Sequence, residues 1–219
     1  MSGCAPAQEP TTPAGASSTA PSAEAALAPL TTAQLRTLAL RDEEVPQAHP
    51  PVEVHEPAPE GNGRAFPPVS EPSCRPLVDV RTGKGSVTHV FQTFNWKENV
   101  MGGGSTLASY EDGRAAQLFA ELKRALATCR SYEGEGYTGK FKATVKAEAA
   151  PQVGDEAVAF REVIPKGPEQ PGDRNEQFVV VRAGNTIVTF SELSVGADLS
   201  FPTELISRQV ERLRDAQRR

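Results

Sequence analysis

The feature that most constrains the fold is a pair of β-branched and apolar runs separated by only two turn residues. Residues 177–183 and 186–193 are joined by Gly184 and Asn185. Glycine and asparagine accept the backbone angles of a tight turn, so two such runs with these residues between them are typical of a β-hairpin. The strands of a hairpin run antiparallel, and the chain is therefore predicted to contain an antiparallel sheet.

Further strands are predicted at residues 85–96, 106–110, 141–149 and 157–164. Residues 141–149 alternate between apolar and polar side chains, which is typical of a strand with one face on the core and one face in water. Residues 85–96 carry apolar side chains on both faces. This pattern indicates a strand that is covered on both sides or that lines a cleft.

Helices are predicted at residues 31–40, at residues 111–130 and from Pro202 towards the C-terminus. The helix at 111–130 has the clearest amphipathic pattern, because its apolar side chains recur every three or four residues. Because the strands are linked by hairpins rather than alternating with helices, the predicted fold class is α+β. We expect an antiparallel β-sheet flanked by a long central helix and a C-terminal helix, with a ligand cleft.

Composition is uneven along the chain. Most of residues 1–30 are Ala, Pro, Ser, Thr or Gly. A segment with so few large apolar side chains cannot offset the entropy that it would lose on ordering. We therefore expect residues 1–30 to be a disordered tether and residues 31–219 to form a single domain. Prolines crowd residues 46–73, which we interpret as an extended connection lying across the domain surface.

The charge pattern argues against nucleic-acid binding. The chain has 23 Lys and Arg against 28 Asp and Glu, for a net charge of −5, and its basic residues are scattered. The one basic run, residues 208–219, is interrupted by Glu211 and Asp215, which is typical of a solvated helix face. No apolar run in the sequence is long enough to span a membrane.

The three cysteines have distinct predicted roles. They lack the close spacing of a zinc site. Cys4 follows Ser2 and Gly3, and this sequence resembles the end of a bacterial lipobox, after which the cysteine carries a lipid; the alternative is a chance cysteine in a disordered tail. Cys74 and Cys129 then form an even pair. In an oxidising compartment outside the membrane we expect a disulfide between them, with two buried free thiols as the alternative.

An ordered set of short motifs resembles a known family. The motifs are Leu-Thr-x-Ala-x-Leu at 30–35, a cysteine after the Pro-rich stretch, Asp-Gly-x-Ala-Ala at 112–116 on a helix that ends in a cysteine, Gly-Asp-Glu-Ala at 154–157, and Val-Val-Val-Arg-x-Gly-Asn-x-Ile-Val at 179–188. Over residues 30–218 they resemble the extracellular sensor domain of PknH-type bacterial serine/threonine kinases, which also occurs alone in actinobacterial lipoproteins.

The resemblance implies an antiparallel sheet flanked by helices, with a cleft for an unidentified ligand. This chain departs from the family in two ways. The kinase sensor domain carries more than one disulfide, whereas one is expected in this chain. The chain also has no kinase portion, so signalling by phosphorylation is not implied.

Residues suited to catalysis or metal binding are few. His49 and His55 lie in the Pro-rich connection without a full ligand set, and the cysteines are committed elsewhere, so no catalytic site, metal or cofactor is expected. Asp155 and Glu156 are neighbours at a strand start. Because neighbouring side chains on a strand point to opposite faces, these two carboxylates are not expected to cooperate as an acid/base pair.

Four residues are the candidates for ligand contact: His89, Trp96, Tyr110 and Arg182. The alternative for His89 is a structural histidine whose hydrogen bonds are satisfied, and the alternative for Arg182 is an exposed or paired arginine of the hairpin. Trp96 stands at a strand end beside Lys97 and Glu98 and is expected to be partly exposed.

The sequence thus predicts a monomeric extracytoplasmic lipoprotein, anchored to the outer face of the cell membrane by a lipid on Cys4. Its expected function is to sense or bind an unidentified small molecule or cell-envelope ligand, and it is not expected to be an enzyme. The alternative is a structural or adaptor lipoprotein that contacts a protein partner or a cell-wall polymer. A deep cleft with convergent polar groups would favour the first function, and a flat exposed patch the second.

Overall fold

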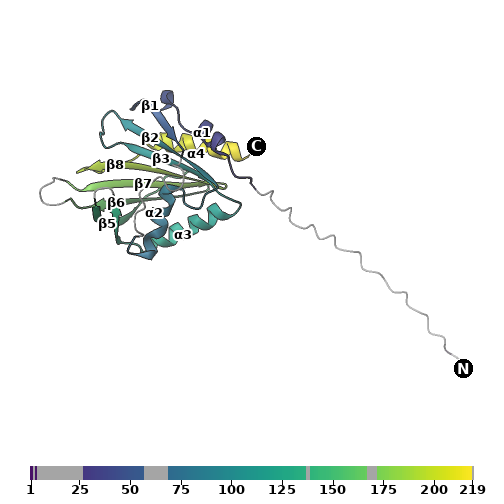
Figure 1. Cartoon of the computed structure of the whole chain (residues 1–219). Helices are drawn as coiled ribbons and strands as arrows, with labels where there is room; N and C mark the ends of the chain where they lie inside the picture. The colour runs from purple at the N-terminus through teal and green to yellow at the C-terminus, as the bar shows by residue number, and fades with distance from the viewer. Residues whose placement is uncertain (2, 4–26, 57–68, 137–138, 167–171, 219) are drawn as a thin grey trace.

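A computed structural model describes residues 1, 3, 27–56, 69–136, 139–166 and 172–218 of the protein (Figure 1). Cys4, most of the predicted tether and the middle of the Pro-rich connection lie outside these residues. The described strands form one antiparallel sheet with helices on both of its faces. This architecture confirms the predicted α+β class.

The sheet has eight strands in the order β1-β2-β3-β8-β7-β6-β5-β4, and every neighbouring pair is antiparallel. The strands are β1 (Ala48–His55), β2 (Thr88–Trp96), β3 (Gly103–Ser109), β4 (Ser131–Gly136), β5 (Gly139–Glu148), β6 (Glu156–Ile164), β7 (Arg174–Ala183) and β8 (Thr186–Val195). The predicted central hairpin is β7–β8. Ala183 pairs with Thr186 across the turn, and Gly184 has the positive φ of 58° that glycine adopts without strain.

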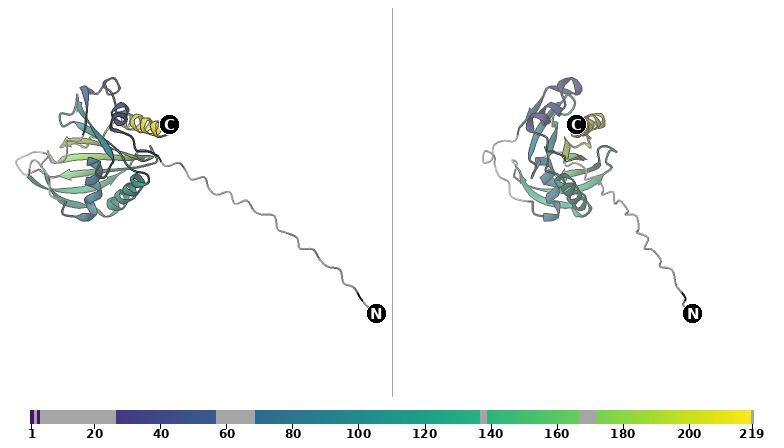
Figure 2. Two further views of the ribbon diagram at one scale, coloured as in Figure 1. Left: turned by 45° about the vertical axis from the view of Figure 1, so that its right-hand side comes forward. Right: turned by 90° about the vertical axis from the view of Figure 1, so that its right-hand side faces the viewer.

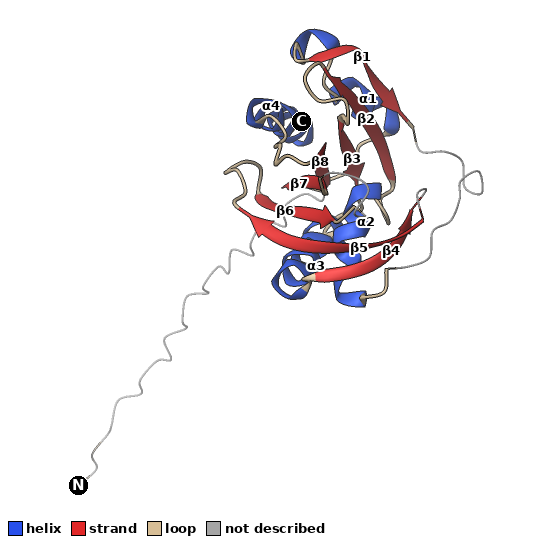
Figure 3. Ribbon diagram, turned by 90° about the vertical axis from the view of Figure 1, so that its left-hand side faces the viewer, coloured by secondary structure: helices blue, strands red, loops and turns tan. Residues whose placement is uncertain are grey.

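Four α-helices and three short 3₁₀ turns of the described chain cover this sheet. Helices α1 (Thr32–Leu38) and α4 (Thr203–Gln217) pack on one face, which we call the α4 face. Helices α2 (Arg75–Asp79) and α3 (Arg114–Thr128) pack on the other, the α3 face (Figures 2 and 3). The 3₁₀ turns are η1 (Asp42–Glu44), η2 (Pro72–Cys74) and η3 (Val80–Thr82).

Each face has its own apolar core. On the α3 face, Phe119 and Leu122 of α3 are fully buried among strand residues that include Phe160, Phe178 and Ile187. Burial of side chains of this size contributes about 1.5–3 kcal/mol each. The buried residues of α3 recur at the predicted helical spacing, and the helix begins three residues later than predicted, after Gly113.

The interpretation of residues 46–73 as a surface connection is wrong over residues 48–55. These residues form β1, which pairs with β2 and buries Ala48 and Val52. Proline disfavours sheets because it lacks an N–H donor, but Pro50 and Pro51 are tolerated because β1 lies at the sheet edge, where donors on the outer side need no partner. The prolines therefore mark an edge strand rather than a loop.

Strand β4 forms the opposite edge of the sheet and was not predicted. Its sequence contains Gly134 and Gly136, which weaken the strand pattern. Gly134 faces the ring of Phe141 on β5, and a Cβ atom at residue 134 would come within 2.5 Å of that ring. The missing side chain thus makes room for an aromatic neighbour.

The folded part of the described chain reaches back beyond the expected boundary at residue 31. Leu30 is buried, and its N–H donates to Ser109 Oγ at 2.8 Å. The carbonyl of Leu27 accepts from Asn185 Nδ2 at 2.8 Å. Residues 27–30 therefore belong to the domain and not to the tether.

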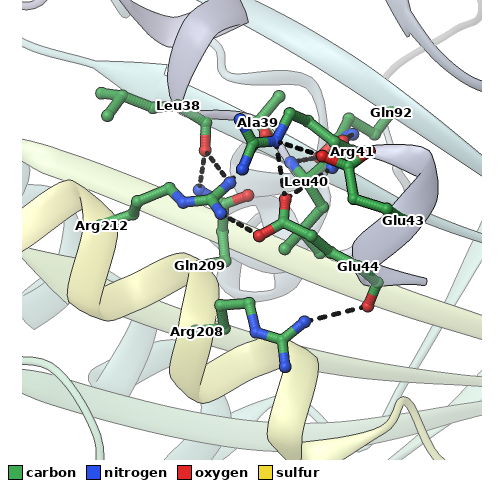
Figure 4. A network of polar contacts seen from close by, with 10 residues as sticks. All are labelled: Leu38, Ala39, Leu40, Arg41, Glu43, Glu44, Gln92, Arg208, Gln209 and Arg212. Carbon is green, nitrogen blue, oxygen red and sulfur yellow. Dashed lines mark hydrogen bonds and ion pairs between the residues drawn. The ribbon is translucent and has the colours of Figure 1, made fainter.

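Polar contacts fasten α4 to the segment that follows α1 (Figure 4). Gln209 Nε2 donates to the carbonyl of Leu38 at 2.9 Å, and Arg208 donates to the carbonyl of Glu44 at 3.0 Å. Arg212 donates to the carbonyl of Ala39 at 3.0 Å and to the carboxylate of Glu44. The basic run at 208–219 is therefore more than a solvated helix face, because two of its arginines are structural ligands of a neighbouring segment.

Candidate functional site

The α3 face of the sheet is not fully covered by its helices. Beyond α2 and η3 the strands β2, β3, β8 and β7 enclose a cavity of about 310 Å³, which we call the sheet-face pocket. Its walls include polar and aromatic side chains: Arg81, Phe91, Thr93, Thr106, Glu176 and Ser191. Residues 102–104 are glycines and line the pocket with backbone atoms only. The pocket is therefore open, polar and small.

A cluster of charged side chains adjoins this pocket; within the cluster, Glu162 is buried and Arg81 and Glu176 are partly buried. Arg81 donates to the carboxylate of Glu162 and stacks over the ring of Phe178, with 4.0 Å between the guanidinium carbon and the ring centroid. Tyr132 donates its hydroxyl proton to the same carboxylate at 2.8 Å. Glu162 lies directly opposite Glu176 in the β6–β7 pair. Two carboxylates thus share one side of the sheet: Glu162 pairs with Arg81, and Glu176 pairs with Arg174 at 2.7 Å.

Local structure places Arg81 over the sheet. It lies on η3, directly after α2, and its Nε donates to the carbonyl of Leu77 one turn earlier at 3.1 Å. The carbonyl of Arg81 accepts from the hydroxyl of Thr106 on β3 at 2.7 Å. The backbone of Arg81 is therefore held by Thr106 on β3, and its side chain is held by the carboxylate of Glu162.

The predicted disulfide holds the start of this segment. Cys74 and Cys129 are bonded with their Cα atoms 5.1 Å apart, and both residues are buried. The bridge joins η2, just before α2, to the residue that caps the C-terminus of α3. In this way the covalent link and the arginine belong to one rigid unit that covers part of the α3 face.

Burial shifts the pKa values of the cluster in the directions that its contacts dictate. Burial raises the pKa of the Glu176 carboxyl, and the nearby cations Arg81 and Arg174 only partly oppose that effect. Burial by itself would lower the pKa of Arg81, but Glu162, Tyr132 and Glu176 together outweigh burial, and the net pKa is raised. Burial also raises the pKa of Tyr132. Arg81 and Tyr132 therefore stay protonated at neutral pH, while Glu176 is an acid of raised pKa beside a cavity.

The structure does not bring the four candidate ligand residues together. Trp96 is buried, with 8% of its surface exposed, which corrects the expectation of a partly exposed side chain. Its ring stacks on Phe94, with centroids 5.1 Å apart, because even-numbered β2 residues face the α4-face core. His89 lies on the other face and contacts Ser86 through Nδ1 at 3.2 Å, and burial lowers its pKa.

Tyr110 and Arg182 line separate cavities. Tyr110 lines one of about 340 Å³ between α2 and α3, and burial raises its pKa to about 12. Arg182 lines one of about 470 Å³ beside Leu27 and the end of α4. The four residues therefore do not form one site.

That Asp155 and Glu156 do not act as an acid/base pair stays a prediction, although both carboxylates contact one arginine. Arg182 donates to Asp155 Oδ2 at 3.1 Å and to Glu156 Oε1 at 2.9 Å. Asp155 lies just before β6 rather than within it, so the strict alternation of a strand does not apply to its side chain. Arg182 is thus paired on two sides, as the structural alternative for a hairpin arginine anticipated.

Sequence reasoning missed Arg81, Glu162 and Glu176. A signal was present in the two strands: Glu162 lies two residues after Phe160, and Glu176 two residues before Phe178. Residues two apart on a strand share a face, so a carboxylate stands where the pattern calls for an apolar residue. Arg81 gave no comparable signal, because only the fold brings it to the sheet.

Two further properties bear on function. Among the described residues, no group of three or more His, Cys, Asp or Glu side chains is arranged to hold a metal ion. Within the same part of the chain, no helix combines the length and the apolar character needed to cross a membrane.

Comparisons with known proteins show the fold. No model of a protein family matches the chain, and no curated protein matches it in sequence. Among solved structures it is similar to the extracellular domain of PknH from Mycobacterium tuberculosis, with a TM-score of 0.56 and 12% identity, covering 87% of this chain and 98% of that chain. At this identity the likeness speaks for the fold alone. The fold that the sequence motifs implied is therefore confirmed: the protein has a fold related to that of the PknH extracellular domain.

Proposed function

We propose that the protein contains a sensor domain that binds a small polar ligand in the sheet-face pocket. The observation that carries the proposal is the cluster of Arg81, Glu162 and Glu176 beside that pocket, in which Glu162 is buried and the other two are partly buried. Buried charges are costly to a fold, and an apolar set of the same volume is often as stable or more stable. Charges kept at the wall of a cavity are therefore candidates for a binding role.

The wall chemistry defines the kind of ligand that fits. Glu176 offers a carboxylate, Ser191 and Thr93 line the pocket with hydroxyl groups, and Phe91 offers part of an aromatic face. At about 310 Å³ the cavity is at the small end of the range for ligand sites. A compact molecule with several hydroxyl, amine or amide groups suits it. Binding, rather than catalysis, is the proposed role.

We also propose that the domain works outside the cell membrane as a monomer, held by a lipid on Cys4. The support is the lipobox-like sequence before Cys4, the Cys74–Cys129 disulfide, and the likeness to a domain described as extracellular. Metabolic labelling with an alkyne fatty acid in an actinobacterial host is expected to label the wild type and not Cys4→Ser. Equal labelling of both would end the anchoring proposal and leave the pocket proposal untouched.

The adaptor function remains a second candidate because of one surface feature. Three large apolar side chains are exposed at the same end of the molecule: Val100 at 98%, Met101 at 43% and Leu199 at 38%. Such side chains are more typical of a contact with a partner than of an inert surface. A ligand-free pocket together with a captured partner would favour this function.

Native mass spectrometry tests the pocket proposal. The full chain, purified from an actinobacterial host, is expected to carry a mass adduct of a co-purifying small molecule. The adduct is expected to be lost from Glu176→Gln, which removes the charge but keeps the shape, and kept by Glu133→Gln, an exposed residue of β4. An adduct with unchanged occupancy in Glu176→Gln would place the ligand elsewhere.

A further inference from the structure

A second cavity, of about 320 Å³, lies on the opposite side of the sheet from the sheet-face pocket. We call it the hairpin-end pocket, because it is enclosed between the connection that follows β2 and the segment before α4. Residues from four parts of the chain line it, among them Gln47, Trp96, Asn99, Glu192 and Leu199. The pocket is independent of the Arg81 cluster, because Glu192 and its neighbour Ser191 point to opposite faces of β8.

Glu192 is a buried carboxylate without a cation. The residue is 4% exposed, and its two carboxylate oxygens accept from neutral donors, Trp96 Nε1 at 2.5 Å and Asn99 Nδ2 at 2.7 Å. Among the described residues, no Lys, Arg or His makes an ion pair with it, in contrast to Glu162, which has Arg81. A buried carboxylate that lacks a counter-charge is unfavourable. Consistent with this, burial raises the pKa of Glu192.

The backbone is shaped to permit this arrangement. A Cβ atom at Gly103 would lie 2.6 Å from Trp96 Nε1 and 2.7 Å from Glu192 Oε2. No side chain fits at residue 103 without displacing one partner of the hydrogen bond. The hydrogen bond between the Glu192 carboxylate and the Trp96 indole therefore lies beside the backbone of Gly103, where no side chain intervenes. This hydrogen bond fixes the carboxylate in the pocket wall.

A second acceptor in the wall is unsatisfied. Gln47 donates through Nε2 to Glu204 at 3.2 Å, whereas its buried Oε1 has no hydrogen-bond partner in the described part of the chain. The nearest lysine of the lining, Lys97, donates to the carbonyl of Pro46 at 2.7 Å. The charge of Lys97 is thus turned to a backbone carbonyl and makes no ion pair with Glu192, while Gln47 Oε1 has no donor among the described residues. Leu199, which lines it, offers an apolar surface that is 38% exposed.

We propose that the hairpin-end pocket binds an organic cation, an ammonium or guanidinium group on an aliphatic stem. The cationic head would lie against Glu192 and the Oε1 atom of Gln47, and the stem along Leu199. The head supplies an ion-pair partner for Glu192 and an N–H donor for Gln47 Oε1. The same chemistry is carried by a free polyamine and by an arginine or lysine side chain of a partner protein.

Trp96 makes the proposal directly measurable, because it is the only tryptophan of the chain and lies in the pocket wall. Its indole N–H gives a single resonance in a ¹H–¹⁵N NMR spectrum. Butylguanidinium titrated into the full chain is expected to shift this resonance with saturation. Butylurea, which has nearly the same shape but no charge, is expected to leave it unshifted. Equal shifts from the two probes, or none from butylguanidinium, would overturn the proposal.

Variants give an independent test. Glu192→Gln is expected to weaken butylguanidinium binding at least tenfold, while Glu176→Gln, in the pocket on the other face, is expected to change it less than twofold. Retained binding in Glu192→Gln would overturn the proposal. If Glu192→Gln does not fold, the comparison of the two probes on the wild type decides.

Two probes separate the sources of the cation. Tighter binding of the capped peptide acetyl-Gly-Arg-Gly-amide than of agmatine would support a partner's side chain, and the reverse order would support a free amine. Failure of both would count against the proposal. Because the readout comes from a pocket on the opposite face, none of these outcomes bears on the ligand of the sheet-face pocket.

Discussion

At the scale of single residues, the carboxylates of Glu162, Glu176 and Glu192 differ in the partners that meet their charge. Glu162 has Arg81 and a tyrosine hydroxyl, Glu176 has the more exposed Arg174 at 2.7 Å, and Glu192 has neutral donors. The stabilising effect of each contact depends on the whole set, because a buried charge is tolerated only when its partners stay in place.

Arg81 is the residue on which the first cluster depends. Arg81→Met is expected to lower the free energy of unfolding by about 3–5 kcal/mol, because it leaves the carboxylate of Glu162 buried without a counter-charge. Lys84→Met is the matched control: Lys84 forms an exposed ion pair with Asp79 at 3.1 Å, and its loss is expected to change stability by about 0.5 kcal/mol or less. Urea unfolding of both variants measures the difference. A loss below about 1 kcal/mol in Arg81→Met would contradict the prediction.

The carboxyl of Glu176 predicts a pH dependence of stability. Its pKa is raised by burial in the folded protein, so the folded state keeps the proton at pH values where the unfolded chain, with a pKa of about 4.3, has released it. Ionisation of Glu176 therefore removes stability as the pH rises from about 4 through the folded-state pKa. The Glu176→Gln variant has no ionisable group at this residue, so it does not lose stability in this way.

The variant is accordingly expected to gain stability relative to the wild type as the pH rises, with little difference below about pH 4. Urea unfolding of wild type and Glu176→Gln at a series of pH values provides the test. A difference that does not vary with pH would show that Glu176 is not the titrating group.

At the scale of elements, short segments are held by a few specific links rather than by large apolar faces. The unit of η2, α2 and η3 spans residues 72–82 and depends on the Cys74–Cys129 bridge, and the segment after α1 depends on the arginines of α4 (Figure 4). Sheet strands, in contrast, are fixed by backbone pairing on both sides except at β1 and β4. Loss of one link should therefore loosen its own unit first.

Removal of the disulfide tests this expectation. In the double variant Cys74→Ser, Cys129→Ser the free energy of unfolding is expected to fall by about 4 kcal/mol on a chain-entropy estimate. Amide hydrogen exchange is expected to quicken first at residues 74–82, with β7 and β8 responding later. Strand β1 is the internal control, because it is held by β2 and not by the bridge. If amide exchange quickened in β1 at the same time as in residues 74–82, residues 72–82 would not be a separate unit that depends on the disulfide.

At the scale of the whole molecule, the two ends of the folded chain are fastened near the β7–β8 turn. Asn185 donates to the carbonyl of Leu27 at 2.8 Å, and its own N–H donates to Gln217 Oε1 at 3.0 Å. Thr186 on the same hairpin accepts from Gln217 Nε2. The hairpin that the sequence marks most clearly is thus also the place where the N-terminal and C-terminal segments meet the sheet.

Two truncations distinguish tether from domain. Deletion of residues 2–26 is expected to leave the melting temperature unchanged, as the composition of the segment predicts. Deletion extended through Leu30 is expected to cost about 2–4 kcal/mol, from a lost buried leucine and a lost backbone hydrogen bond. Calorimetry of the two shortened chains measures both effects. A clear drop in melting temperature for the shorter deletion would contradict the predicted tether.

The sequence alone determined the features that neighbouring residues control. Gly184 and Asn185 defined the central hairpin, the three- and four-residue apolar spacing defined α3, and hairpin-linked strands defined the α+β class. Edge strands were harder to predict. Prolines in β1 and glycines in β4 weaken the local pattern, and they are tolerated because an edge strand has one unpaired side.

Only the tertiary structure decided the candidate sites. Arg81 and Glu162 lie 81 residues apart in the chain, and Trp96 and Glu192 lie 96 apart. Nothing in the sequence near Arg81 indicates a carboxylate partner. Nothing near Trp96 indicates that its ring is buried and that its indole N–H donates to a carboxylate. Turns and periodicity follow from local backbone sterics and side-chain spacing, whereas the environment of a charge depends on which distant strands the sheet brings beside it.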